Sequence, residues 1–143
     1  MYEILEHTSD FKVHGVGSSL EELFSEIARG AFFVSSGIKP PKDAKEKGKV
    51  FDISVEGADN ESLLVNFLSE LIYLYSAEKV FCWDFDLVIA RSEATRQSRL
   101  KLTGKAYAFP AEKIEVEIKA ATYSGLKVER TDRGWEATVV FDI

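Results

Sequence analysis

The order of two hydrophobic periods along the chain is the feature that most restricts its fold. Apolar residues recur every three to four positions near residues 19–36 and 59–76, which is typical of amphipathic helices. Most of the remaining chain alternates apolar and polar residues or is rich in apolar ones, which predicts strands at 10–16, 50–56, 80–90, 99–107, 114–121, 126–128 and 135–143. Two early helices and a run of late antiparallel strands predict an α+β domain, with both helices packed on a largely antiparallel β-sheet assembly.

Local signals set the ends of the two predicted helices. Ser19 followed by Glu22 has the spacing of a capping box, and Gly37 is a typical residue to end that helix at about residue 35. Asp59 or Asn60 is expected to cap the second helix, which runs to about residue 76. Its polar residues fall on one narrow stripe, so we expect this helix to be buried on most of its circumference.

The length and composition predict one soluble domain that spans residues 1–143. A chain of this size buries a sufficient core without cross-links, and the single Cys82 excludes an intrachain disulfide. No uncharged stretch is long enough to span a membrane, and the first residues lack the basic and apolar pattern of a signal peptide. A cytoplasmic location is therefore expected.

The charge balance argues against direct binding of nucleic acid. The chain has 18 basic and 24 acidic residues, a net charge of −6, whereas nucleic-acid binders usually present a basic face. The lysine-rich segment 38–49 is open to two interpretations, a basic arm that touches RNA or a solvated connection. The connection is favoured because the segment has no aromatic residue to stack on a base. Any role near RNA is expected to be indirect, through a protein partner.

Several residue combinations are candidates for chemistry. Cys82 could form a nucleophilic pair with His7 or His14, although a lone cysteine is more often a buried packing residue. The two histidines could instead join aspartates in a metal-dependent hydrolase site, but they lack the spacing of a helical zinc motif. Asp84 and Asp86 share one face of a predicted strand, where they could hold a cation, act as an acid–base pair, or discourage pairing at a sheet edge.

A further acidic site is predicted where the last strand ends. That strand keeps its alternation to the final residue, so a carboxylate at Ile143 would lie beside Asp142 at a fixed position. If Asp10, at the head of the first predicted strand, lies close to this end, three carboxylates converge. Their repulsion would be relieved by a divalent cation that prefers oxygen ligands.

At these residues the chain resembles the archease family. The resemblance covers nearly the whole chain in order, and it is carried by Tyr2-Glu3-x-x-Glu6-His7-Thr8-Ser9-Asp10, Gly15, Gly17, Ser19-Leu20-Glu21-Glu22-Leu23-Phe24, residues 61–74, Glu117-x-Lys119-Ala120-x-Thr122-Tyr123, Gly125-Leu126-x-Val128 and Asp142-Ile143. The chain departs from the family at two places: Glu112-Lys113-Ile114-Glu115 stands where the family often has a His-Glu-Pro-Lys run, and Ser124 stands where it often has a His.

The resemblance implies a function that the residues alone do not indicate. The resemblance implies that this chain is a non-enzymatic activator of the RtcB-type RNA ligase. Such an activator promotes guanylylation of the ligase and its repeated turnover in tRNA splicing or RNA repair. The resemblance also implies a divalent cation, most often Ca²⁺, held by Asp10, Asp142 and Ile143. Lys119, Thr122 and His7 are lower-ranked candidates for a partner-facing or ligand-facing surface. The alternatives are a general chaperone or interaction module with an apolar groove in its helix layer, and a metal-dependent hydrolase that uses His7, Asp10 and Asp142.

Overall fold

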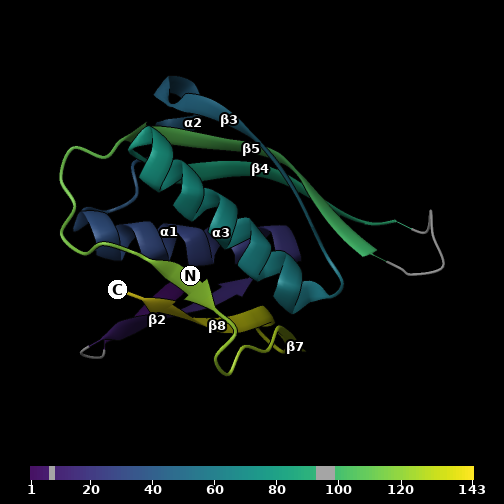
Figure 1. The fold of residues 1–143 in the computed structure, drawn as a ribbon. Helices are drawn as coiled ribbons and strands as arrows, with labels where there is room; N and C mark the ends of the chain where they lie inside the picture. The colour runs from purple at the N-terminus through teal and green to yellow at the C-terminus, as the bar shows by residue number, and fades with distance from the viewer. Residues whose placement is uncertain (7–8, 93–98) are drawn as a thin grey trace.

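The computed structural model describes residues 1–6, 9–92 and 99–143, and it shows two antiparallel sheets with helices between them (Figure 1). Along the chain the elements are β1 (Tyr2–Glu6), β2 (Asp10–Gly17), α1 (Leu20–Ser36), α2 (Ala44–Lys47), β3 (Lys49–Gly57), α3 (Asn60–Glu78), β4 (Val80–Ser92), β5 (Arg99–Pro110), β6 (Ala120–Thr122), β7 (Glu129–Thr131) and β8 (Gly134–Asp142). The predicted α+β class is confirmed. The division of the strands into two sheets around the helices goes beyond the prediction.

The two sheets have different strand orders. The five-stranded sheet has the order β1-β2-β8-β6, with β7 also paired to β8, and the three-stranded sheet has the order β3-β5-β4. Every pairing is antiparallel. Helices α1 and α3 lie between the sheets, so each sheet has one face on the helices and one face toward solvent (Figure 1).

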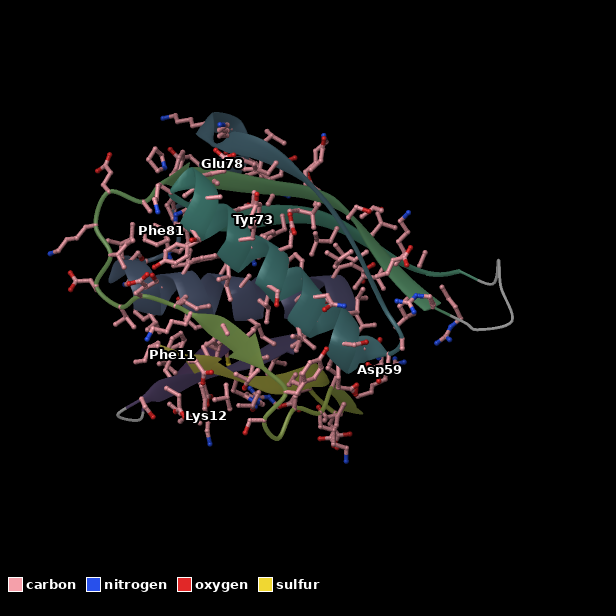
Figure 2. All side chains as sticks on the ribbon, in the orientation of Figure 1. Phe11, Lys12, Asp59, Tyr73, Glu78 and Phe81 are labelled. Carbon is pink, nitrogen blue, oxygen red and sulfur yellow. The ribbon has the colours of Figure 1, made fainter. Side chains whose placement is uncertain are left out.

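Both long helices begin and end close to the predicted positions. The Ser19 hydroxyl accepts the Glu22 N–H at the start of α1, and Gly37 ends this helix in the left-handed conformation. At the start of α3 the Asp59 carboxylate accepts the Ser62 N–H at 2.7 Å. Of the predicted polar stripe on α3, Ser62 is half-buried and the other members are exposed, namely Asn66, Ser69, Tyr73 and Ser76. Tyr73 is 63% exposed and points away from the core (Figure 2).

Aromatic side chains connect the layers through one continuous core. The Phe32 ring of α1 lies near the rings of Tyr75, Phe81 and Trp83, at centroid distances of 6.1, 5.9 and 6.5 Å. All four side chains are buried. This cluster fixes the end of α1 against both α3 and β4, because ring contacts of this kind contribute beyond the burial of apolar area.

The predicted strand at 114–121 is wrong for residues 114–119. Only residues 120–122 form a strand, and residues 111–119 cross the end of α1 as an irregular segment. The Ser35 carbonyl accepts the N–H groups of Glu115 and Val116 at 2.7 and 3.2 Å. The segment therefore satisfies part of its backbone on the helix end, where α-helical carbonyls have no partner of their own.

Three smaller expectations also differ from the structure. Strand β1 was not predicted, although it pairs with β2 along its whole length. The loop predicted at 38–49 contains the single turn α2, whose Ala44 is fully buried. The strand expected at 126–128 lies instead at 129–131, as β7. The described part of the chain has no helix with the length and apolarity needed to cross a membrane.

Candidate functional site

The pairing of β2 with β8 brings Asp10 and Asp142 together. The two residues are directly opposite each other in the register, and Ala120 of β6 lies opposite Asp142 on its other side. Side chains opposite each other in an antiparallel pair have Cβ atoms about 5 Å apart. Two carboxylates from distant parts of the sequence are thus neighbours on one sheet face.

Alternation along both strands directs these carboxylates away from the core. Phe11 and Phe141, the neighbouring residues, are buried and directly paired, and their rings stack at a centroid distance of 5.1 Å. Figure 2 shows Phe11 directed toward the helix layer and Lys12 directed away from it. The stacked pair fixes the register, because a slip of one residue would exchange the core face and the solvent face.

Asp10 has a buried oxygen that no described residue meets with a donor. Its Oδ1 atom is shielded from solvent and has no hydrogen-bond partner within the described ranges. Neither Asp10 nor Asp142 forms an ion pair with a described residue. A buried acceptor without a donor costs about 1–3 kcal/mol, and more when it is charged. The arrangement is therefore suited to a cation that binds oxygen.

The residues present provide part of such a cation site. Asp10 and Asp142 offer carboxylate oxygens, and the Ile143 N–H donates to the Ser9 carbonyl at 3.4 Å, which holds residue 143 beside the start of β2. Ca²⁺ takes six to eight oxygen ligands. Among the side chains that the structure describes, which do not include that of Glu6, no cluster of three His, Cys, Asp or Glu occurs, so Asp10 and Asp142 leave coordination positions for water or a partner's oxygens. His7, the histidine predicted nearby, lies outside the described residues.

The lower-ranked residues Lys119 and Thr122 flank this end of β8. The Lys119 N–H donates to the Asp142 carbonyl at 2.9 Å, and its exposed side chain lines a hollow of about 240 Å³ beside the end of α3. The Thr122 hydroxyl donates to the Val140 carbonyl at 3.0 Å. Thr122 therefore has a structural role in holding β6 to β8, whereas the Lys119 side chain makes no ion pair with the described residues.

Of the two alternative nucleophilic pairs, Cys82 with His14 is not assembled, whereas His7 lies outside the described residues. Cys82 is fully buried in β4, and burial raises the pKa of its thiol to about 12. His14 lies on the outer face of the other sheet, where its ring nitrogens contact Thr138 Oγ1 at 2.8 Å and Glu136 Oε1 at 3.0 Å. The helix layer lies between the two sheets, so Cys82 and His14 cannot act together. The cross-strand partners of His14 were not predicted, because they depend on the register of β2 with β8.

Asp84 and Asp86, the other predicted acidic pair, each have a basic partner. Asp84 accepts from the Arg29 guanidinium at 2.7 Å, and Asp86 accepts from Lys45 at 2.9 Å and from the Tyr107 hydroxyl at 2.6 Å. The hydrogen bond from Tyr107, followed by that from Lys45, lowers the pKa of Asp86. These acids connect α1 and α2 to β4, so among the described residues their charges are already compensated.

Comparison with known proteins gives one consistent result. Residues 2–143 match the family described as "Archease protein family (MTH1598/TM1083)". The chain is 38% identical to a protein archease of Methanosarcina mazei, over 99% of this chain and 95% of the relative. It is 40% identical to a protein archease of Pyrococcus furiosus, over 99% of this chain and 98% of the relative.

Solved structures with the same fold are also known. The solution structure of protein 1598 of Methanobacterium thermoautotrophicum matches with a TM-score of 0.71, at 24% identity, over 99% of this chain and 98% of that one. A crystal structure from Thermotoga maritima, described as an archease and possible chaperone, matches with a TM-score of 0.59. Its identity is 28%, over 100% of this chain and 98% of that one.

Proposed function

Since this chain belongs to the archease family, we propose that it is a non-enzymatic protein activator of an RtcB-type RNA ligase. It would promote guanylylation of the ligase and its repeated turnover in tRNA splicing or RNA repair. The observation that carries this proposal is the cross-strand pair of carboxylates at Asp10 and Asp142, which no described residue compensates and which lies at the end of the five-stranded sheet.

In this proposal the carboxylates hold a divalent cation, Ca²⁺. Asp10 and Asp142 would bind it through side-chain oxygens, and Ile143 through its main-chain or terminal oxygen. The bound cation would supply a positive charge that oxygen atoms of the ligase can approach. The chain's own residues set the position of this charge: the Phe11–Phe141 stack fixes the register, and the Lys119 N–H anchors the Asp142 backbone.

The electrostatics support a protein partner over direct contact with RNA. The chain has a net charge of −6, and the candidate site is acidic before a cation binds. Phosphate backbones are attracted mainly by clusters of Lys and Arg. RNA would therefore be engaged through the ligase.

The geometry also supports a role other than catalysis. Cys82 is buried with a raised pKa, and both ring nitrogens of His14 are already engaged. An enzyme needs a nucleophile or base within reach of its substrate. In the described residues the candidates for these roles are committed to packing or to hydrogen bonds inside the fold.

The decisive experiment combines the protein with a purified RtcB-type ligase, GTP and an RNA with matching ends. We expect guanylylated ligase and joined RNA to increase with added protein when Ca²⁺ is saturating. Asp10→Asn and Asp142→Asn should lose the stimulation, whereas Asp52→Asn should retain it. Asp52 is an exposed acid on β3, where it pairs with Lys105 at 3.1 Å, so it controls for the loss of one surface charge.

A general chaperone is the second candidate, because the related Thermotoga maritima protein is described as a possible chaperone. A chaperone role predicts that substoichiometric amounts of the protein suppress the aggregation of unrelated unfolded proteins in the absence of the ligase. It also predicts that Asp10→Asn does not change this suppression. Absence of any stimulation of the ligase, together with suppression of aggregation, would replace the proposed function by the chaperone. Cation-dependent cleavage of a phosphoester without ligase would instead indicate a hydrolase.

A further inference from the structure

An apolar hollow opens beside the end of α1. It has a volume of about 280 Å³, and its floor is aromatic, with buried Phe81 and Trp83 and half-buried Phe109. Ile38, which is 53% exposed, forms part of its wall. Concave sites with an apolar floor and a few polar groups at the edge are the usual binding sites for side chains and ligands.

The edge of this hollow is acidic. Its charged residues are Glu112, Lys113 and Glu115, and the Lys113 Nζ atom pairs with Glu115 Oε1 at 3.0 Å. Glu112 has no ion-pair partner in the described part of the chain. The hollow therefore combines an apolar floor with one uncompensated negative charge at its edge. An apolar side chain that is next to a lysine or arginine in the partner would complement both features.

The hollow and the candidate cation site lie at the same end of the molecule. Residues within 112–115 contribute to the edge of the hollow, and the same segment ends at Lys119, whose N–H donates to the Asp142 carbonyl (Figure 1). Glu115 and Lys119 are four positions apart in the sequence, so their Cα atoms are at most about 14 Å apart. A standard interface of about 800 Å² per partner is wide enough to cover both.

We propose that this hollow is a second contact for the same ligase and that it receives an apolar side chain followed or preceded by a basic residue. This inference rests on the proposed function, because it names the same partner. A few residues dominate the binding energy of an interface when an apolar side chain of the partner is desolvated in a well-packed pocket, such as one with an aromatic floor. The cation site would set the orientation of the complex, and the hollow would supply much of its affinity.

The test measures the affinity of the full chain for the purified ligase at saturating Ca²⁺. Ile38→Glu should weaken binding by about tenfold or more, because the charge would face the incoming apolar side chain. Glu112→Lys should weaken it by about threefold to tenfold through repulsion of the basic residue. Val88→Glu is the matched control: Val88 is an aliphatic residue that is 61% exposed on β4 and does not line the hollow. It should bind like the unaltered chain.

Thermal unfolding with and without Ca²⁺ accompanies each variant. Ile38→Glu should keep both the melting temperature and its increase with Ca²⁺, which shows that the fold and the cation site persist. Equal affinities of Ile38→Glu and Val88→Glu for the ligase would overturn the hollow as a contact and leave the proposed function standing. If the unaltered chain does not bind the ligase, both the proposed function and this inference are wrong.

Discussion

Asp84 and Asp86 on β4, and Asp10 and Asp142 at the end of the five-stranded sheet, are two acidic pairs with different surroundings. The first pair has Arg29, Lys45 and Tyr107 within hydrogen-bond distance. Among the described residues, the second pair has no basic partner and its one buried oxygen has no donor. Both pairs were candidates for chemistry in the sequence. The comparison teaches that an acid compensated from within the fold is structural, whereas an uncompensated one is available to a ligand.

The largest expected effect concerns the compensated pair. Arg29→Met should reduce the free energy of unfolding by about 3 kcal/mol, the lower end of the range for a broken buried pair, because both partners are about a quarter exposed. The change also removes the 2.9 Å hydrogen bond from Arg29 to the Trp83 carbonyl. Urea unfolding measures the effect. Lys45→Met, which removes a more exposed partner, should cost less than about 1 kcal/mol; equal losses in both variants would contradict this interpretation.

The next effect concerns the uncompensated pair. Ca²⁺ at about 100 times its dissociation constant should stabilise the fold by roughly 2.7 kcal/mol, because it binds only the folded chain. This corresponds to an increase of several degrees in melting temperature. Calorimetry should show that Asp10→Asn and Asp142→Asn lose the increase and that Asp86→Asn keeps it. A full Ca²⁺ response in both of the first two variants would remove Asp10 and Asp142 as ligands.

Without divalent cations, the two pairs should respond to neutralisation with opposite signs. Asp142→Asn should raise the free energy of unfolding by about 0.5–1 kcal/mol, because like charges directly opposite in a sheet repel each other. Asp86→Asn should lower it by about 0.5 kcal/mol, the value for an exposed ion pair. Both measurements need a chelator in the buffer. Destabilisation by Asp142→Asn under these conditions would indicate that the carboxylate has a compensating partner.

The smallest effect is a pH dependence from Asp86. Hydrogen bonds from Tyr107 and Lys45 lower its pKa below the ordinary value of 3.8. Because the folded-state pKa is the lower one, the stabilisation is complete above pH 3.8 and is lost as the pH falls through the folded-state value. Solvent screening limits it to a few tenths of a kcal/mol. Stability measured from pH 5 to pH 2 should fall less steeply in Asp86→Asn; identical slopes would show that the partners do not favour the charged form.

Features set by neighbouring residues could be predicted from the sequence. Ser19 and Asp59 cap their helices as expected, because a cap depends on residues only three positions apart. The alternation at 114–119 was misleading for a related reason. Alternating burial requires only that every second side chain face the core, as Ile118 does, and it does not require a neighbouring strand. In this segment the hydrogen-bond partner is Ser35 at the end of α1.

The candidate site depends on pairings that the sequence leaves open. Asp10 was proposed to lie near the last strand, but that proximity was an assumption, and the register of β2 with β8 now places Asp10 opposite Asp142. The partners of Asp84 and Asp86 come from α1, α2 and β5, which no local pattern connects to β4. The roles of Asp10, Asp142 and Ile143 as cation ligands stay predictions from the family resemblance.

The pairing of β2 with β8 also has a consequence for the time course of folding. Contacts between these strands join residues more than 120 positions apart, such as His14 and Thr138, which are 124 positions apart. Closing so long a loop costs entropy before any contact repays it, so folds rich in distant contacts form slowly. During synthesis, the helices and the three-stranded sheet can form before β8, the partner strand of β2, has been made. We therefore expect the acidic end of the five-stranded sheet to be absent from early folding intermediates. In refolding experiments, the formation of these intermediates should not depend on Ca²⁺.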